Sequence, residues 1–392
     1  MKGRVALAAV SLVLLAAAAL AALLWKIGTS PEAAGSAPGG RIAFSAPEDS
    51  GSLPFPPSDL YVIDADGSGR RRLADCDDPF SIASARRGEF GCILRAFAWS
   101  PDGERLAYVQ GNMGGRDRGP DLSLFVVDVD GENERRLDGC GKPKWPSCGD
   151  FYGSQLAWDP HGSRLVVPRN GALYVFDVDG GGYRRLSPDC GARKCYDMHP
   201  AWSPDGRSIV FARQVAARSQ ALYSITPDGS NFTRLTHLPG QAGHATWSPN
   251  GRSIAFDFWD EEHSRLYVMA ADGSHLKLLR SGTNATGPSV PAWSPDGTEI
   301  AYLVTPQAGT VFSAEIWVAR ANGSKRRRLY RSALWLETWG RPVWSPGGRY
   351  IAFAVGLSED REKSGIYIVN ADGTGLRRLV DAPTEAAWQP SP

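Results

Sequence analysis

The stretch Trp202-Ser203-Pro204-Asp205-Gly206, followed by Ile209-Val210-Phe211, decides the fold of this chain. Proline and Asp-Gly are typical of tight turns, so the stretch predicts a hairpin between a strand ending in tryptophan and a short apolar strand. A Trp-x-Pro core recurs at Trp99, Trp158, Trp202, Trp247, Trp293, Trp344 and Trp388. Consecutive tryptophans are 44 to 59 residues apart, so the chain is built from repeats.

Two further strands complete each repeat. One alternates and ends in an Asp-Gly or Asn-Gly turn, as in 223–229, and the other ends in Arg-Arg-Leu or a close variant, as in 184–186. Four short strands in roughly 45 residues are typical of a β-propeller blade. Strands two to four occur seven times from Ile42 onward, whereas the seventh copy of strand one, around Trp388, ends the chain. The sequence therefore predicts an all-β, seven-bladed β-propeller over residues 41–392, closed by the C-terminal strand.

The order of these motifs resembles the TolB-like, WD-related propeller repeat over about residues 41–392. The resemblance implies a fold shared with TolB, with the propellers of the dipeptidyl-peptidase and prolyl-oligopeptidase families, and with some polysaccharide lyases. The chain differs from TolB, which pairs a six-bladed ring with an N-terminal α/β domain. It also lacks the Gly-x-Ser-x-Gly nucleophile turn of the peptidases. The resemblance thus implies the architecture and leaves the function open.

The N-terminus contains an apolar segment, residues 5–25, that has no charged side chain. As a helix its 21 residues span roughly 32 Å, which matches a hydrocarbon core of about 30 Å. Cleaved signal peptides have shorter apolar regions, so we expect a transmembrane signal-anchor, with cleavage near residues 33–36 as the alternative. Because Lys2 and Arg4 precede it, residues 1–4 are expected in the cytoplasm. Residues 26–40 then form a flexible linker, and the propeller lies outside the cytoplasm, in the periplasm or at the cell surface.

Six cysteines follow the apolar segment and fall in three local pairs between successive blades: Cys76 and Cys92, Cys140 and Cys148, and Cys190 and Cys195. Zinc ligands are commonly separated by two to four residues, so only the last pair fits a zinc pattern. Cysteines outside the cytoplasm are generally oxidised. We therefore predict three local disulfides, although six cysteines allow 15 pairings.

The recurring tryptophans occupy one structural position, so we interpret them as core residues rather than ligand contacts. Other aromatic residues fall in connections of variable length, between strands two and three and between blades, which share one face that we call the loop face. Its candidate binding aromatics are Trp145, Tyr152, Trp259, Trp335 and Trp339. Exposed aromatic rings stack on sugars or anchor protein partners, and the alternative is that they cover gaps between blades.

One position, three residues before each repeated tryptophan, is expected to line the mouth of the central tunnel. It is occupied by Ala96, Gln155, His199, His244, Val290, Arg341 and Glu385. Gln155, His199, His244, Arg341 and Glu385 are the predicted ligand-binding residues. Such side chains can grip an acidic ligand or serve acid–base chemistry, and the alternative is that they are simply hydrated. We predict no cofactor. If the chain binds one, the pattern allows a metal ion at His199 and His244.

The net charge of the chain indicates which classes of partner to expect. The chain has 43 basic and 42 acidic residues, a net charge of +1, so no positive field indicates a nucleic-acid partner. We predict a membrane-anchored, extracytoplasmic binding scaffold whose loop face holds a protein, a peptide or an envelope polymer. The alternative is a tunnel-mouth enzyme, such as a metal-dependent polysaccharide lyase or a hydrolase-like activity. No catalytic residue is predicted, which favours the scaffold.

Overall fold

The computed structural model describes residues 39–47, 58–75, 92–112, 121–138, 155–191, 195–283, 286–306, 314–331, 341–355, 364–381 and 386–390. The chain divides into two compact units, residues 1–38 and 39–392, and every described residue belongs to the second. All regular elements in these ranges are β-strands. No helix within them is long and apolar enough to cross a membrane, and the predicted anchor at residues 5–25 lies outside them.

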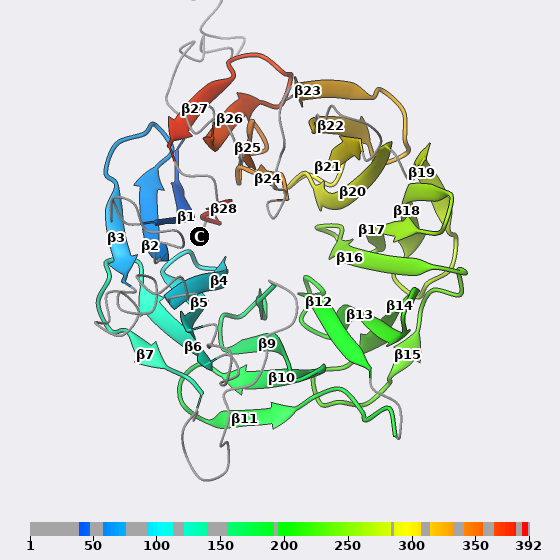
Figure 1. Ribbon diagram of the computed structural model, residues 1–392, viewed down its shortest axis with the longest axis horizontal. Helices are drawn as coiled ribbons and strands as arrows, with labels where there is room; N and C mark the ends of the chain where they lie inside the picture. Colours follow the sequence, from blue (N-terminus) through cyan, green and yellow to red (C-terminus); the bar gives the residue numbers. More distant parts are fainter. Residues whose placement is uncertain are drawn as a thin grey trace, which may run out of the picture. The chain divides into compact units, whose positions relative to one another are not determined.

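The strands form antiparallel four-stranded groups that follow one another around a common centre (Figure 1). The first sheet contains β28 (Ala386–Trp388), β1 (Arg41–Pro47), β2 (Ser58–Asp64) and β3 (Arg71–Ala74). The second contains β4 (Cys92–Trp99), β5 (Arg105–Asn112), β6 (Asp121–Asp128) and β7 (Arg135–Arg136). The third contains β8 (Ala157–Trp158), β9 (Arg164–Arg169), β10 (Ala172–Asp177) and β11 (Gly182–Arg185).

The next three groups are joined into one longer sheet. They are β12 (Tyr196–Trp202), β13 (Ile209–Ala216), β14 (Ser219–Ile225) and β15 (Thr233–Arg234); β16 (Gln241–Trp247), β17 (Ser253–Trp259), β18 (His263–Ala270) and β19 (Lys277–Thr283); and β20 (Thr286–Trp293), β21 (Glu299–Pro306), β22 (Glu315–Arg320) and β23 (Arg327–Arg331). The last sheet contains β24 (Val343–Trp344), β25 (Tyr350–Val355), β26 (Gly365–Asn370) and β27 (Arg377–Val380). Within this sheet, the strand pairing continues from one group to the next through one residue pair at each junction, Gln220 with Gln241 and Thr283 with Thr286.

The repeated turn has the chemistry that its sequence predicts. In the turn between β12 and β13, the Ser203 hydroxyl donates to Asp205 Oδ1 at 2.6 Å, and the Gly206 N–H donates to the Ser203 carbonyl at 2.9 Å. Gly206 has φ +69°, a left-handed conformation that a residue without Cβ adopts at little cost. Ser203 also accepts a hydrogen bond from the Ser208 N–H at 2.9 Å. These local hydrogen bonds fix the turn that follows Trp202, the last residue of β12.

The core consists of hydrophobic clusters that lie between successive groups. One of them packs Trp202 of β12 against Leu186 of the preceding group. Another packs Trp388 and Ile42 of the first sheet against Ile366 of the last sheet. Burial of large apolar side chains on both sides of every junction makes each group depend on its neighbours.

The indole nitrogens add a second, repeated link between groups. With the exception of Trp388, each repeated tryptophan donates its Nε1–H to the carbonyl of the residue just before the preceding tryptophan, at 3.0–3.2 Å. The pairs are Trp99 with Ala387, Trp158 with Ala98, Trp202 with Ala157, Trp247 with Ala201, Trp293 with Thr246 and Trp344 with Ala292. The tryptophans therefore have a structural role, as the sequence analysis predicted.

Trp202→Phe should cost more stability than Trp388→Phe. Trp202 is buried and loses a hydrogen bond to Ala157, whereas the Nε1 of buried Trp388 has no acceptor among the described residues. A lost hydrogen bond with a buried acceptor left unpaired costs about 1–2 kcal/mol. Urea denaturation should give that loss for Trp202→Phe and less than half of it for Trp388→Phe. Equal losses would mean that ring packing, not the indole hydrogen bond, sets the stability of these junctions.

The outer strands supply a third link, which the sequence analysis did not predict. In four of the five Arg-Arg-Leu stretches, the first arginine donates to a backbone carbonyl of the Asp-Gly turn in the following group; in the fifth, Arg135 donates to the Asp179 carboxylate of that turn. Arg71 reaches Val129, Arg184 reaches Pro227, Arg327 reaches Ala371 and Arg377 reaches Ala65. The first arginine of the motif therefore links neighbouring groups by a hydrogen bond.

Candidate functional site

The backbone is unusual at the position predicted to line the tunnel mouth. The registers of β12, β16 and β20 shift between Met198 and Ala201, Gly243 and Thr246, and Ser289 and Ala292. Each bulge contains a residue with a left-handed backbone, namely His199 (φ +53°), His244 (φ +44°) and Val290 (φ +47°). This conformation is strained for side chains with a Cβ and most of all for valine. Bulges redirect side chains and are frequent beside active sites.

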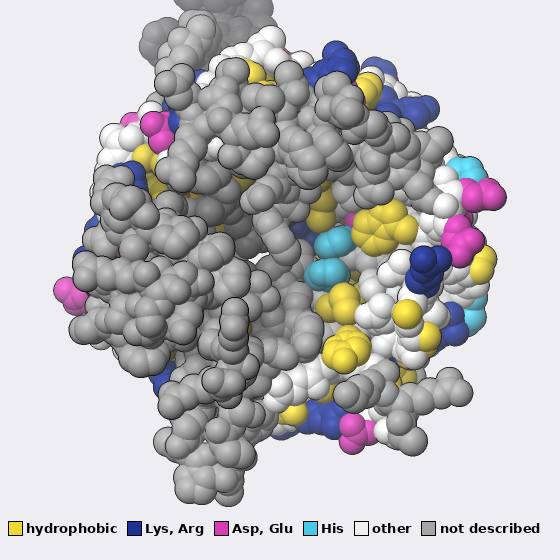
Figure 2. Space-filling view, viewed as in Figure 1, with side chains coloured by type: hydrophobic (Ala, Val, Ile, Leu, Met, Phe, Trp, Pro, Cys, Tyr) yellow, Lys and Arg dark blue, Asp and Glu magenta, His cyan; other side chains and the backbone are white. Residues whose placement is uncertain are grey.

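His199 and His244 lie in contact. Their rings stack with centroids 4.1 Å apart and an interplanar angle of 28°. Figure 2 shows adjacent histidine side chains near the middle of one face, bordered by apolar side chains. Burial lowers the pKa of His199 well below its usual value, and the nearby His244 and Arg341 act in the same direction. His199 is therefore neutral at about pH 7, and its buried Nδ1 has no hydrogen-bond partner among the described residues.

His244 is oriented by a buried carboxylate. Its Nδ1 lies 2.9 Å from Oδ2 of Asp257 on β17, a side chain with no solvent exposure. The same oxygen accepts the Val290 N–H at 2.9 Å, and Oδ1 has no partner within the described ranges. With Nδ1 engaged, Nε2 of His244 is the nitrogen that remains for a ligand.

The sequence analysis missed Asp257. It concentrated on the residues before each tryptophan, whereas Asp257 lies within strand two of its repeat. The signal was present, since Asp257 is the single charged residue in the apolar run Ile254-Ala255-Phe256-Asp257-Phe258. A carboxylate in a strand that is otherwise buried requires a partner, and here the partner is His244.

Trp259 borders His244. The two rings meet edge to face with centroids 5.8 Å apart and an interplanar angle of 83°. The sequence analysis placed Trp259 in a connection of the loop face, but it is the last residue of β17, and residues 260–262 make the connection. The strand extends this far because Trp259 pairs with Gln241 of β16 and Ser264 of β18. The ring is therefore held on a strand beside the histidines.

Arg341 and Gln155 come together from segments that precede β24 and β8. With its amide oxygen toward the guanidinium, Gln155 accepts from Arg341 Nε at 3.1 Å and from Nη2 at 2.5 Å. Arg341 is also near enough to His199 to lower the pKa of that imidazole. Four of the five predicted tunnel-mouth residues thus make two contacting pairs, which are linked by the electrostatic effect of Arg341 on His199.

Glu385 and the loop-face aromatics Trp145, Tyr152, Trp335 and Trp339 lie outside the described residues. Within the described ranges, no group of three or more His, Cys, Asp or Glu residues is arranged to hold a metal ion. His199, His244 and Asp257 do not form such a group, because the Asp257 carboxylate is engaged with Nδ1 of His244.

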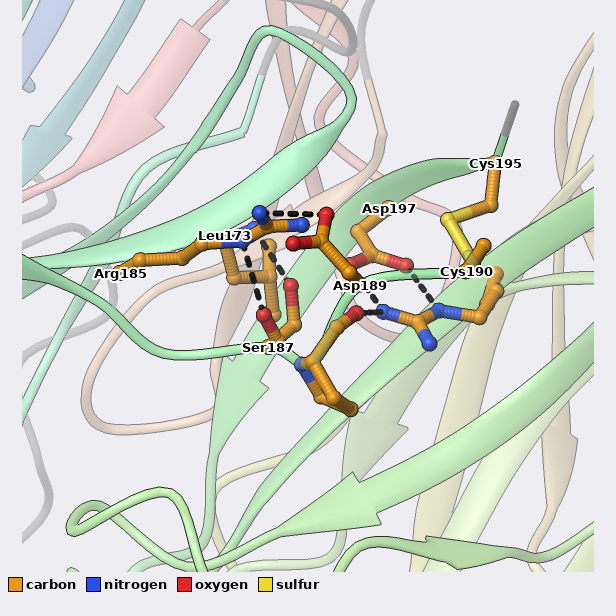
Figure 3. The surroundings of a disulfide bond; sticks show 9 residues. Leu173, Arg185, Ser187, Asp189, Cys190, Cys195 and Asp197 are labelled. Carbon is orange, nitrogen blue, oxygen red and sulfur yellow. Dashed lines mark hydrogen bonds and ion pairs between the residues drawn. A yellow bond between two sulfur atoms is a disulfide. The ribbon is translucent and has the colours of Figure 1, made fainter. Parts of the chain in front are cut away.

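One of the predicted disulfides is confirmed. Cys190 is bonded to Cys195, with their Cα atoms 6.1 Å apart, in the segment between β11 and β12 (Figure 3). Cys92 is also disulfide-bonded. Its predicted partner Cys76, together with Cys140 and Cys148, lies outside the described residues, so those two pairings stay predictions.

Peptide mapping of the exported protein without reductant should recover Cys190 with Cys195, Cys76 with Cys92, and Cys140 with Cys148. The reason is that each pair lies in, or at the end of, a single connection between successive groups, where a local bridge closes a short loop. The same digest after reduction is the control. A peptide that links cysteines from two different connections would contradict the local pairing.

A buried ion pair lies beside the disulfide. Arg213 of β13 donates from Nε to Asp197 Oδ1 at 2.6 Å and from Nη2 to Asp197 Oδ2 at 2.8 Å. Its Nη2 also donates to the Pro188 carbonyl at 2.9 Å, and its guanidinium lies over the ring of Phe232. Figure 3 shows Asp197 close to the disulfide. Since Asp197 and His199 both belong to β12, this pair anchors the strand that presents His199.

Comparison with known proteins is consistent with this fold. The family model of the TolB β-propeller domain matches residues 98–334. An uncharacterized protein of Agrobacterium fabrum is 29% identical in an alignment 140 residues long that covers 33% of this chain. The chain thus spans 46% of the length of that curated relative.

Three solved structures are similar. They are TolB from Acinetobacter baumannii (TM-score 0.52, 18% identity, 85% of this chain and 79% of the other), an oligogalacturonate lyase in complex with manganese (0.58, 14%, 88% and 86%) and a prolyl endopeptidase (0.60, 14%, 90% and 49%). Identities this low show the fold alone. The family model, however, covers more than half of the chain. The resemblance inferred from the repeats is therefore confirmed, and the chain belongs to the TolB β-propeller domain family.

Proposed function

We propose that this protein is a membrane-anchored, extracytoplasmic propeller of seven blades, closed by its C-terminal strand, that binds a protein, a peptide or an envelope polymer. The closed ring is supported by the pairing of β28 with β1 and by the cluster that joins the last sheet to the first. The Cys190–Cys195 disulfide favours an oxidising compartment. The apolar residues 5–25 would supply the anchor.

The observation that carries the binding role is the convergence of His199, His244, Trp259 and Arg341. His199 comes from one strand group and His244 and Trp259 from the next; the two histidine rings stack, and the Trp259 ring meets His244 edge to face. Arg341, from a third group, is near enough to His199 to lower the pKa of that imidazole. Polar groups and an aromatic ring, brought together on a rigid scaffold, are typical of ligand sites. The strained backbone at His199 and His244 supports the same interpretation, because strain persists at functional sites.

Capture experiments with the full-length chain in detergent test this role. An affinity-tagged wild-type protein incubated with an envelope extract of its host should retain a partner that the double variant His244→Ala, Trp259→Ala loses. His275→Ala, at an exposed turn of the same group, is the matched control and should retain the partner. Equal capture by all three proteins, or no capture by the wild type, would show that His244 and Trp259 do not form the binding site.

A tunnel-mouth enzyme is the second candidate, and the Asp257–His244 hydrogen bond favours it. A carboxylate that fixes an imidazole by one nitrogen leaves the other nitrogen able to accept a proton from a substrate. An acidic polysaccharide is the substrate class to test first, since an oligogalacturonate lyase shares the fold. Turnover that falls by roughly a hundredfold or more in His244→Asn, with KM little changed, would favour catalysis over simple binding.

A further inference from the structure

The turn between the third and fourth strands has the same length in every repeat, so the repeats can be compared position by position. Over its first seven residues, this turn has a net negative charge in six repeats, between −1 and −4. The exception is residues 320–326, between β22 and β23, where Arg320, Lys325 and Arg326 give a net charge of +3. We call these residues the basic turn. It is a single positive turn among negative ones.

The basic turn keeps the structure of the acidic turns. Asn322 Oδ1 accepts the Ser324 N–H at 3.0 Å and the Ser324 hydroxyl at 2.6 Å. In the preceding group, Asp272 accepts the same two bonds from Ser274 at 2.9 and 2.6 Å. An amide oxygen therefore replaces the carboxylate oxygen, and the turn loses only a negative charge.

The backbone at Lys325 is strained. Its φ is +50°, at a position where every other repeat has Gly, Asn or His. Gly and Asn adopt this left-handed conformation at the least cost, whereas a lysine gains nothing from it locally. Strain of this kind is retained at functional sites, so the lysine points to a role for its charge.

The charges of the basic turn face solvent. Arg320, Lys325 and Arg326 are exposed, and they form no ion pair within the described ranges. The next two arginines along the strand are paired with Glu299 at 2.6 Å and with Glu315 at 3.0 Å. Figure 2 shows Lys and Arg side chains gathered at the edge of the molecule where Figure 1 places β23. The three charges of the turn are therefore available to an anionic partner.

Exposed leucines flank the basic turn. Leu276 and Leu278 of the preceding group are 43% and 48% exposed, and Leu376 of the following group is 45% exposed. Leu276 and Leu376 occupy the turn position that Arg326 occupies in the basic turn. Basic side chains bordered by apolar ones suit a membrane surface, where cations meet the headgroups and apolar side chains enter the interface.

Contacts between neighbouring groups make these side chains one continuous surface. Gly323 of the basic turn lies against the backbone of Leu279, the residue after Leu278. On the other side, Arg327 donates to the carbonyl of Ala371 at 2.9 Å, in the turn that carries Leu376. We call this surface the rim patch. It consists of Leu276, Leu278, Arg320, Lys325, Arg326 and Leu376.

The rim patch ends beside the point where the chain enters the propeller. Arg377, which follows Leu376, donates to the Ala65 carbonyl, and the Ala65 N–H donates to the Gly40 carbonyl at 2.9 Å. Residues 26–38 precede this point, and as an extended linker they would reach at most about 45 Å. A membrane that holds residues 5–25 would therefore be within reach of the patch.

Resting on the membrane anchor proposed above, we propose that the rim patch lies against the anionic lipid headgroups of the same membrane. The basic turn meets the lipid phosphates, and the leucines on either side enter the interface. The most acidic turn, residues 128–134, belongs to the second sheet, well apart from β23 around the common centre (Figure 1). Because like charges repel, the propeller meets the membrane by one edge and not by a whole face.

Hydrogen exchange of the full-length chain in vesicles tests this contact. One set of vesicles contains phosphatidylcholine alone, and the other contains an equal amount of phosphatidylglycerol. The amides of residues 320–326 should exchange roughly threefold more slowly, or slower still, in the anionic vesicles, because bound lipid restrains the exposed turn. At about 1 M NaCl this protection should disappear. Residues 226–232, the equivalent turn of another group, are the reference and should exchange alike in both vesicles.

One variant reverses the charge of the basic turn by copying residues 128, 130, 133 and 134 of the second repeat. It carries Arg320→Asp, Asn322→Asp, Lys325→Asn and Arg326→Glu. Asn133 has φ +52°, so the copied residues fit the same turn, and thermal unfolding should match that of the wild type. This variant should lose the protection in anionic vesicles.

Two further variants separate the parts of the patch. The double variant Leu276→Ser, Leu376→Ser should lose part of the protection, since its basic turn is intact. Arg207→Asp, at an exposed turn of a different group, is the matched control and should be protected like the wild type.

Equal exchange of residues 320–326 in neutral and anionic vesicles, or protection that survives in the charge-reversed variant, would overturn the inference. Protection that appears in detergent without lipid and grows with protein concentration would overturn it too, by identifying a second copy as the occupant. Flotation at about 1 M NaCl reports on the anchor separately. If the chain leaves the vesicles there, the anchor fails. Low-salt flotation with phosphatidylglycerol vesicles then decides the patch, because only the charge-reversed variant should fail to float.

Discussion

Deleting residues 384–392 should lower the free energy of unfolding by more than about 4 kcal/mol. The deletion removes β28, which pairs Trp388 with Ile42 of β1 and leaves that strand with an open edge. It also removes the Trp388 ring, which is 5% exposed, from the cluster between the first and last sheets. Loss of a buried tryptophan alone costs about 3–5 kcal/mol.

Several hydrogen bonds are lost with the same segment. Trp99 donates to the Ala387 carbonyl, and the Gln389 side chain donates to the Gly103 carbonyl. The Gln389 N–H donates to the Arg41 carbonyl, and the Arg41 N–H donates to Oε1 of Gln389. Urea denaturation of the full-length protein and the truncated protein measures the loss. A protein shortened only by residues 391–392 is the control. Identical denaturation midpoints for the truncated and intact proteins would show that the C-terminal strand does not close the fold.

Arg213→Met should destabilise the protein by about 3–5 kcal/mol. Asp197 has no solvent exposure, and Arg213 donates two hydrogen bonds to its carboxylate, so the variant buries an uncompensated charge. The Pro188 carbonyl loses its donor as well. Thermal unfolding at about pH 7 should show the loss.

The double variant Arg213→Met, Asp197→Leu is the decisive control for this prediction. Replacing a buried ion pair with apolar residues of similar size is often neutral or stabilising, so the double variant should recover most of the lost stability. If the double variant is as unstable as Arg213→Met, the loss comes from packing against Phe232 and not from the unpaired carboxylate.

Much of the fold was predictable because its determinants are local. The Trp-Ser-Pro-Asp-Gly turn is fixed by hydrogen bonds between Ser203, Asp205 and Gly206, all within four residues of Trp202. The displaced copy of strand one predicted a partner for Ile42, and Trp388 is that partner in the sheet. The indole and arginine links were not predictable, since each joins residues in separate repeats whose relative placement no local pattern specifies.

Part of the candidate site was predictable from the sequence, and part was not. Counting back from each tryptophan located His199 and His244, because the repeat carries both to equivalent places in adjacent groups, where their rings meet. The contact between Gln155 and Arg341 joins groups that are not adjacent in the chain, so no spacing predicted it. Asp257 was missed because its importance comes from the bulge in β16, which turns His244 toward it.

The junction between β28 and β1 has a further consequence for the order of folding. Other junctions join residues about one repeat apart, such as Trp202 and Ala157, 45 residues from each other, whereas Arg41 and Gln389 are 348 residues apart. Closing the longer loop costs roughly 2 kcal/mol more chain entropy. This junction should therefore form last in refolding and open first under mechanical tension, which makes the two chain ends of the domain the place where unfolding begins.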